Sequence, residues 1–491
     1  MTSRRFGLSK SKISLFEQCP KRLWLSVHRP ELAEESDRVR ASFAAGHVVG
    51  EFACRLRPDG IMVDANDGLA AAVEQTSDLL AAGWDRPIFE ATFAHDGVLI
   101  RADIIEPHDG GWHLAEVKNT TGVKAYHIGD IATQVWVMRS CGIDVRSAAV
   151  RHLDRSFMLT REGDYAGLYA DTPVLAMVEP IAARRAEVVA QAREMLGGDE
   201  PVRELGDHCD DPFTCSFKAY CGRHLPQPPE WPVALLPDAA GKKVARSLLA
   251  QGITDLTLAP VGAMTNAKLA RVHAATLSAQ AYHDAEAVRR ETADWAYPRV
   301  FLDFETIQFA IPRWIGTSPF TQVPFQFSAH IETAEGVIDH IAFLAADGSD
   351  PRRACAEALT ALPATGAVIA WNASFERQCL TGLAEQFPDL APSLQSLADR
   401  LVDLLPIARR NYYHRDMRGS WSIKAVLPTL AAIGYEDLVE VKSGTDAQTA
   451  YFEAIDPGTT PERAAAIRDA LFDYCRRDTE AMVQVLAALT R

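Results

Sequence analysis

Residues 301–306 read FLDFET, and this stretch places two acids, Asp303 and Glu305, inside what is otherwise the pattern of a buried strand. Because side chains alternate across a strand, both carboxylates are expected on one face, with Leu302 and Phe304 on the other. Two carboxylates held side by side repel each other unless a cation lies between them. The stretch therefore predicts a strand that carries part of a divalent-metal site.

The composition is that of a soluble protein with more than one core. The chain has 491 residues, which favours two or three domains. Its hydrophobic share of 48% and charged share of 23% are ordinary for a globular protein. No apolar run is long enough to span a bilayer, and the N-terminal stretch lacks the apolar core of a signal peptide. We therefore expect a cytoplasmic protein without a membrane partner, whose nine cysteines are reduced unless they hold a metal.

The charge balance argues against one class of nucleic-acid-binding protein. A formal net charge of -15 does not suit a protein that coats nucleic acid by neutralising phosphates. It does not exclude an enzyme, because metals and local basic strips can supply the attraction. Two such strips run over residues 4–29 and 409–424, and the second interleaves basic residues with Tyr412, Tyr413 and Trp421. That mixture suits a single strand whose bases can stack, and a solvated loop is the alternative that composition favours.

Three regions follow one another along the chain. Residues 1–225 alternate helical and strand-like patterns. Residues 226–296 begin with a proline-rich linker and continue as a small helical spacer. Residues 297–491 alternate strands with helices again. The expected fold class is α/β, with two larger domains on either side of the spacer.

The third region contains two further acidic motifs. The stretch AVIAWNASFERQCL, residues 367–380, predicts a strand that ends at Asn372 and a helix that carries Glu376 one turn later. The last predicted helix carries Tyr474 and Asp478, four apart and so on one face. Together with FLDFET, these blocks resemble, in order, the three motifs of the DEDD 3′–5′ exonuclease superfamily. The Tyr-x-x-x-Asp spacing resembles its tyrosine branch.

This resemblance implies a ribonuclease H-like fold over residues 297–491 and a site that binds Mg²⁺ or Mn²⁺. Two such ions can activate water and stabilise the leaving oxygen of a phosphodiester, and hard cations prefer carboxylate oxygens. Tyr474 would orient the attacking water. The sequence departs from the family at Glu376, where the usual residue is Asp, and Asp403 is an alternative contributor. The resemblance assigns as metal ligands Asp303, Glu305, Glu376 and Asp478.

The first region carries a second constellation. GVLIRADIIEP, residues 97–107, and GWHLAEVKN, residues 111–119, predict two adjacent strands joined by a glycine turn. Carboxylates there can bind a cation while a lysine steadies the attacking water. The order of residues resembles the RecB-like branch of the PD-(D/E)xK nucleases, although Ala102 replaces the usual proline. This resemblance implies a restriction-endonuclease-like fold whose site residues are His47, Asp103, Glu116, Lys118 and Gln134.

Four cysteines flank that constellation. One lies in SLFEQCPKRLWL, residues 14–25, and three lie six apart in DHCDDPFTCSFKAYCGRH, residues 207–224. The layout resembles that of iron–sulfur nucleases of the RecB branch, which implies a structural [4Fe–4S] cluster. Zinc is the alternative, although zinc sites usually bring close C-x-x-C pairs, which these four cysteines lack. The implied cluster ligands are Cys19, Cys209, Cys215 and Cys221.

The whole chain resembles bacterial RecB-like families that fuse an iron–sulfur PD-(D/E)xK domain to a DEDD exonuclease domain. The resemblance implies a metal-dependent nuclease with two centres that acts on DNA, single-stranded or at ends, in DNA repair or defence. RNA is the alternative substrate. Two other hypotheses stay open: one centre is active while the other grips the strand, or the chain is a non-catalytic iron–sulfur adaptor for nucleic acid.

Overall fold

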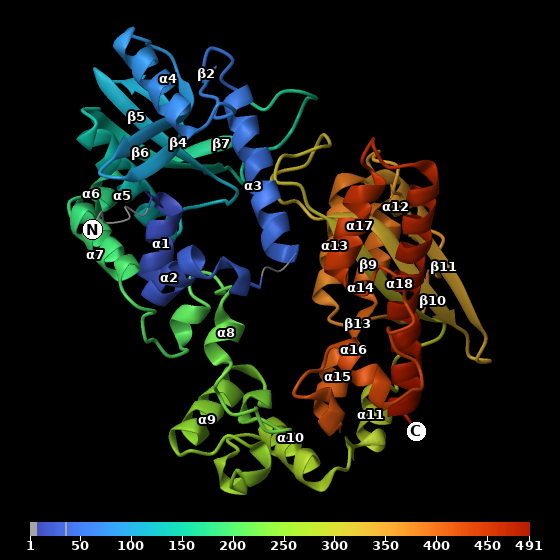
Figure 1. The fold of residues 1–491 in the computed structure, drawn as a ribbon. Helices are drawn as coiled ribbons and strands as arrows, with labels where there is room; N and C mark the ends of the chain where they lie inside the picture. The colour runs from blue at the N-terminus through green and yellow to red at the C-terminus, as the bar shows by residue number, and fades with distance from the viewer. Residues whose placement is uncertain (1–6, 35–36) are drawn as a thin grey trace. The chain divides into compact units, whose positions relative to one another are not determined.

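The computed structural model describes residues 7–34 and 37–491, the side chains of residues 37–44 excepted. The chain divides into two compact units (Figure 1). The first contains residues up to 225 together with 309–321, and the second contains 226–308 together with 322–491. Each unit combines helices with a sheet, which confirms the expected α/β class. None of the helices in the described part of the chain is long and apolar enough to cross a membrane.

The first unit is built on a seven-stranded sheet. Its central hairpin pairs two antiparallel strands through a turn at Asp109 and Gly110, so Gly110 lies in the turn as predicted, whereas Gly111 already begins the second strand. The next crossover is parallel and runs through α5 (Ala125–Ser140). The strands are β1 (Leu8–Ser9), β2 (Ile61–Met62), β3 (Ile88–His95), β4 (Val98–His108), β5 (Gly111–Lys118), β6 (Val145–Leu153) and β7 (Tyr169–Pro173).

Helices bury apolar side chains of this sheet. Ile131 and Val135 of α5 enter the main core, and α1 (Lys10–Gln18) adds Ile13 to it. A smaller core contains Val49 and Ala53 of α3 (Asp37–Arg55). The remaining helices of the first unit are α2 (Pro20–His28), α4 (Leu69–Ala81), α6 (Leu175–Ala182), α7 (Arg185–Gly197) and α8 (Lys218–Gly222).

The segment 309–321 belongs to the first unit although both neighbouring strands belong to the second. Its Ala310, Ile311 and Phe320 pack against the smaller core around α3. Leu159 exchanges backbone hydrogen bonds with this segment, donating to the Thr317 carbonyl oxygen at 3.0 Å and accepting from the Gly316 N–H at 2.7 Å. The segment is therefore a structural part of the first unit.

The second unit contains a five-stranded sheet in the order β11-β10-β9-β12-β13. The first three strands are antiparallel, and β12 and β13 run parallel to β9. FLDFET lies in a strand, β9, as predicted. This strand has the antiparallel β10 on one side and the parallel β12 on the other. The strands are β9 (Arg299–Ile307), β10 (Val323–Glu332), β11 (Ile338–Leu344), β12 (Val368–Ala370) and β13 (Leu401–Asp403).

Opposite faces of β9 have different surroundings. Leu302 and Phe304 enter an apolar core with the helices α12 (Arg352–Leu359), α13 (Ser374–Gln386) and α14 (Ala391–Asp399). The long helix α18 (Pro461–Leu489) lies along β9 and β10 (Figure 1). The polar Gln326 of β10 faces it and donates to the Leu471 carbonyl oxygen at 2.8 Å. The side of β9 that carries Asp303 and Glu305 therefore meets a polar environment.

The helical stretch 226–296 belongs to the second unit and pairs with the second basic strip. It contains α9 (Asp238–Ala250), α10 (Ala267–Ser278) and α11 (Ala285–Glu291). Its strand β8 (Tyr282–His283) pairs with β14 (Tyr412–Tyr413). Tyr412, Tyr413 and Trp421 are buried there, so neither the base-stacking strip nor the solvated loop considered from the sequence describes these aromatic residues.

Candidate active sites

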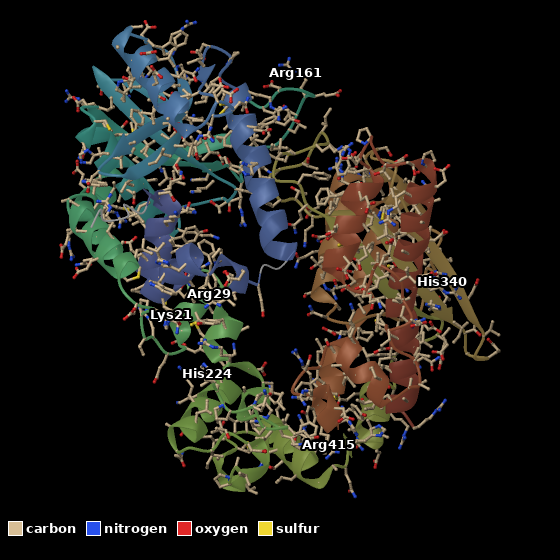
Figure 2. All side chains as sticks on the ribbon, viewed as in Figure 1. Lys21, Arg29, Arg161, His224, His340 and Arg415 are labelled. Atoms are coloured by element: carbon tan, nitrogen blue, oxygen red, sulfur yellow. The ribbon has the colours of Figure 1, made fainter. Side chains whose placement is uncertain are left out.

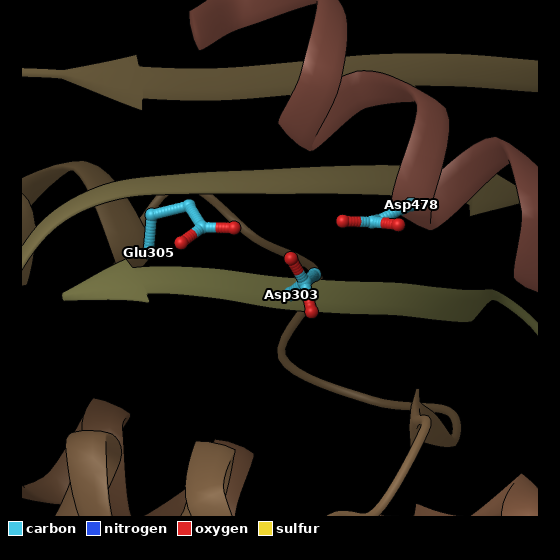
Figure 3. A group of neighbouring side chains, drawn as sticks. All are labelled: Asp303, Glu305 and Asp478. Carbon is cyan, nitrogen blue, oxygen red and sulfur yellow. The ribbon is translucent and has the colours of Figure 1, made fainter. Parts of the chain in front are cut away.

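Three carboxylates meet in the second unit, on β9 and α18. Asp303 and Glu305 rise from the strand toward Asp478 on the helix (Figure 3). One oxygen of each lies within 4.8 Å of the others, which makes this the one such group of His, Cys, Asp or Glu side chains among the described residues. The i, i+2 spacing on the strand and the face of the helix produce this convergence. Oxygen ligands so arranged suit a hard divalent cation.

Burial and mutual repulsion disfavour the charged form of these acids. Burial and the charges of Asp478 and Glu305 raise the pKa of Asp303 well above its usual range. Burial and the charge of Asp478 raise the pKa of Glu305 to about 8. Burial also raises the pKa of Asp478. Without a cation, burial and repulsion therefore favour the protonated form of these carboxyls, and a divalent ion would favour the ionised form instead.

Two tyrosines and a lysine adjoin the triad. The Tyr435 hydroxyl donates a short hydrogen bond to Oδ1 of Asp478. Lys424 Nζ donates to the Tyr474 hydroxyl at 3.2 Å and lies 4.8 Å above the centre of that ring. Burial and the charge of Asp478 raise the pKa of Tyr474, so its hydroxyl keeps its proton. The sequence predicts Tyr474 as a site residue, whereas Tyr435 lies outside every motif and Lys424 belongs only to the basic strip 409–424.

Glu376 lies near the triad without joining it. It occupies the first turn of α13, 3% exposed, and no described residue offers its Oε2 a hydrogen-bond donor. Burial and the charge of Asp403 raise the pKa of Glu376 to about 8. Its charge also raises the pKa of Asp303, so the two are electrostatic neighbours.

Asp403 and Asn372 have structural roles next to Glu376. Asp403 caps α15 (Leu404–Asn411) by accepting from the Leu405 N–H at 3.0 Å. The same oxygen accepts from the Asn372 N–H at 3.0 Å. The strand ends at Ala370 rather than at Asn372, which has φ 75° and precedes α13, so the expected strand end and shared helical turn are wrong. Asp403 is thus engaged with the backbone rather than with the triad.

The first unit brings together four of its five predicted residues around Glu116. This carboxylate is 1% exposed and accepts from Lys118 Nζ at 2.8 Å and from Gln134 Nε2 at 2.7 Å. Asp103, on the adjacent strand, accepts from the Val117 N–H at 2.8 Å. The hairpin and α5 therefore place the predicted Asp, Glu, Lys and Gln in one group.

A residue that sequence reasoning missed completes this group. Lys10, at the start of α1, places Nζ 2.8 Å from Glu116 Oε1 and 3.8 Å from Asp103 Oδ1. Although burial opposes it, Lys10 and Lys118 hold the pKa of Glu116 well below its usual range. Burial and the charge of Glu116 raise the pKa of Asp103 to about 7. Lys10 lies far from the motif along the chain, and only its membership of a basic strip marked it.

His47, the fifth predicted residue of the first unit, lies on an exposed face of α3. It is exposed on α3, and the one metal-competent group found among the described residues does not include it. The helix faces the sheet through Val49 and Ala53, which are buried. No hydrogen bond or ion pair among the described residues joins His47 to Asp103 or Glu116, so its role as a metal ligand stays a prediction.

The four predicted cluster cysteines line a single cavity. Cys19, Cys209 and Cys215 are buried and Cys221 is half-buried around it. The side chain of Gln18 joins the two parts of the chain that carry them, because its Nε2 donates to the carbonyl oxygens of His208 at 2.8 Å and Phe213 at 2.7 Å. The start and the end of the first unit thus meet at the cavity.

The thiols of this cavity are accompanied by basic side chains. Tetrahedral zinc with Zn–S bonds of about 2.3 Å would hold four sulfurs about 3.8 Å apart. Within the described ranges, no three of these thiols lie within 4.8 Å of one another. Lys21, which Figure 2 labels, and Arg22 also line the cavity, and Arg22 Nε is buried without a hydrogen-bond partner. The cavity thus combines four thiols with cationic side chains.

Comparison with known proteins gives one partial match. Residues 300–422 match the family model described as a domain of unknown function, DUF2779. This range contains Asp303, Glu305 and Glu376, and it ends before Tyr474 and Asp478. No curated protein matches the chain.

Proposed function

We propose that the chain is a metal-dependent nuclease whose second unit removes nucleotides from a 3′ end. The observation that carries this proposal is the triad of Asp303, Glu305 and Asp478, in which Glu305 and Asp478 are buried and Asp303 is half-buried. Buried carboxylates without a compensating cation are costly, and their raised pKa values indicate a site that is incomplete without one. Exonuclease chemistry and its 3′–5′ polarity come from the resemblance to the DEDD superfamily.

The triad would hold Mg²⁺ or Mn²⁺, which supply an activated water and stabilise the leaving oxygen of a phosphodiester. The protein's own residues prepare this site. The protonated Tyr474 hydroxyl can orient a water, and Lys424 holds that hydroxyl from the other side. Tyr435 orients Asp478 through its hydrogen bond. Glu376 adds a fourth carboxylate nearby, at the position where the resemblance expects the remaining ligand.

The first unit supports a second nuclease centre of the RecB-like PD-(D/E)xK type. Asp103 and Glu116 would bind the divalent ion, and Lys118 would steady the attacking water. Gln134 fixes the Glu116 carboxylate by its hydrogen bond at 2.7 Å. The cysteine cavity supports a structural [4Fe–4S] cluster over zinc, because no three of its thiols lie within 4.8 Å of one another among the described residues and cationic side chains line it. Both functions fit DNA as the substrate, with RNA as the alternative.

Cleavage of labelled single strands tests the proposal. We expect 3′-end removal from single-stranded DNA with Mg²⁺ or Mn²⁺, measured beside RNA of the same sequence. Asp303→Asn keeps the side-chain shape and should lower this activity about 100-fold or more. Lys118→Met should leave 3′-end removal intact and abolish any cleavage by the first unit. Asp473→Asn, on the exposed side of α18, is the matched control.

The single and double variants also separate the alternatives. If only one centre hydrolyses DNA, one of the two substitutions removes all cleavage and the other changes only binding. If the folded Asp303→Asn, Lys118→Met double variant cleaves as fast as the parent, both site assignments are wrong. A parent protein that binds DNA and cleaves neither nucleic acid would support the adaptor hypothesis.

A further inference from the structure

Lys10 occupies the position between the two acids of the first unit's centre. Its Nζ lies 2.8 Å from Oε1 of Glu116 and 3.8 Å from Oδ1 of Asp103, and it also donates to the Arg101 carbonyl oxygen at 3.4 Å. A divalent ion shared by this pair of carboxylates would need the same oxygens. The lysine ammonium therefore stands where a cation ligated by both acids would be expected.

The local structure holds Lys10 at a position that is unfavourable for a positive charge. Lys10 is the first residue of α1, and a cation is unfavourable at a helix N-terminus because the helix dipole is positive there. Ser9 caps this helix, and the preceding strand β1 pairs with β4 through Leu8 and Ser9. Pairing of β1 with β4 thus fixes the backbone just before Lys10 beside the strand that carries Asp103. The attraction of the Lys10 ammonium to Asp103 and Glu116 offsets its unfavourable interaction with the helix dipole.

The charges of the pocket are balanced differently with and without Lys10. Lys118 shares Oε1 of Glu116 with Lys10, and it also lies 3.4 Å from Asp130 Oδ2. Lys118 is therefore divided between two carboxylates, while Asp103 has its closest ammonium contact in Lys10. Removing Lys10 would leave the Asp103 charge without an ion pair in the described part of the chain, and a divalent cation could compensate it.

We propose that Lys10 is an internal cation that competes with the divalent metal for Asp103 and Glu116, so that Mg²⁺ or Mn²⁺ enters this centre only as the Lys10 ammonium withdraws. The inference rests on the proposed metal centre of the first unit. It goes further, because it assigns a competing role to a side chain of α1.

Calorimetric titration with Mn²⁺ tests the competition directly. The full chain carries Asp303→Asn and Asp478→Asn, which remove the metal site of the second unit. In this background, Lys10→Met should bind Mn²⁺ about tenfold or more tightly than its parent, because a neighbouring positive charge has been removed. Lys12→Met is the matched control, since Lys12 on the same helix donates to the Gly7 carbonyl oxygen at 2.8 Å instead of to the acids.

A second measurement needs no substitution and covers the case in which Lys10→Met does not fold. Acylation of lysine amines, followed by peptide mass spectrometry, reports how available each ammonium is. Mn²⁺ should accelerate acylation of Lys10 severalfold and leave that of Lys12 unchanged.

Three results would overturn the inference. Mn²⁺ binding by Lys10→Met that is equal to or weaker than that of its parent would show that Lys10 does not compete. Acylation of Lys10 that does not respond to Mn²⁺ would show that the ammonium stays in place. Absence of Mn²⁺ binding in both proteins would remove the metal centre itself. Cleavage by the chain with Asp303 and Asp478 intact reports separately on the nuclease proposal.

Discussion

Asp303, Glu305 and Asp478 bring three acidic groups into one site, and the nearby charge of Lys424 offsets only part of the effect of burial on the pKa of Glu305 and Asp478. The pKa of Glu305 is raised to about 8 in the folded state, mainly by burial and then by the charge of Asp478. In the unfolded chain this pKa returns to its ordinary value of about 4.3. Between these two values the folded protein binds protons that the unfolded chain has released. The metal-free second unit is therefore expected to lose stability as the pH rises through this window.

This linkage predicts that metal stabilisation grows with pH. From pH 5.5 to 8.5, the metal-free second unit should lose on the order of 3 kcal/mol of its free energy of unfolding. Mn²⁺ should restore most of that loss at pH 8.5 and have little effect at pH 5.5, where protons hold the ligand oxygens. Thermal unfolding with and without Mn²⁺ at both pH values measures the difference. A stabilisation that is equal at both pH values, or that persists in Asp303→Asn, would contradict the assignment.

Substitution of the two tyrosines beside the triad is expected to have different effects on cleavage and on metal affinity. Tyr474→Phe removes the hydroxyl that would orient water, so we expect cleavage to fall about 100-fold with Mn²⁺ affinity nearly unchanged. Tyr435→Phe removes the hydrogen bond to Asp478, so Mn²⁺ affinity should weaken about tenfold. Steady-state cleavage at several Mn²⁺ concentrations separates the two effects. Tyr412→Phe is a buried control, because its hydroxyl donates to Thr429 instead.

The reverse pattern would reassign the tyrosines. If Tyr474→Phe changed metal affinity and spared cleavage at saturating Mn²⁺, Tyr474 would be a support for the ligands. If cleavage and Mn²⁺ affinity after either substitution matched those of Tyr412→Phe, the two hydroxyls would contribute only to the stability of the fold.

Among the elements, those with a clear period were predictable from the sequence. β9 contains FLDFET as predicted, the β4–β5 hairpin has a glycine in its turn, and α5 and α18 carry the predicted site residues. Periodicity fixes which side chains share a face, so it placed Asp303 with Glu305 and Tyr474 with Asp478. It also placed Glu116 with Lys118.

Elements whose environment depends on distant partners were not predictable in this way. The strip 409–424 has the composition of a solvated loop, yet β14 pairs with β8 from residues more than a hundred positions earlier and buries its tyrosines. Lys10 and Tyr435 reach their acids from segments without a motif. His47 has the expected helix but lies on its exposed side. Local pattern thus identifies the acids of each centre, while the basic and aromatic side chains around them depend on tertiary packing.

At the scale of the whole molecule, the two units have separate cores. The main cluster of the first unit contains the sheet side chains under α5, and that of the second contains Leu302, Phe304 and the helices beneath β9. Separate cores favour separate unfolding transitions. The cysteine cavity joins the two ends of the first unit, so a cluster there should stabilise that unit alone.

These features predict two melting transitions that respond to different metals. The anaerobically purified chain should be brown. Cys215→Ser should remove the colour and lower the melting temperature of the first unit by about 5 °C or more. Cys215→Ser should leave the melting temperature of the second unit unchanged, whereas Mn²⁺ at pH 8.5 should raise it. Cys141→Ser is the control, since this cysteine is exposed in the same unit and lies outside the cavity. A colourless protein with one zinc per chain would refute the cluster. A Cys215→Ser chain that melts like its parent would also refute it, because loss of one of the four ligands should remove both the cluster's colour and the stability that the cluster gives to the first unit.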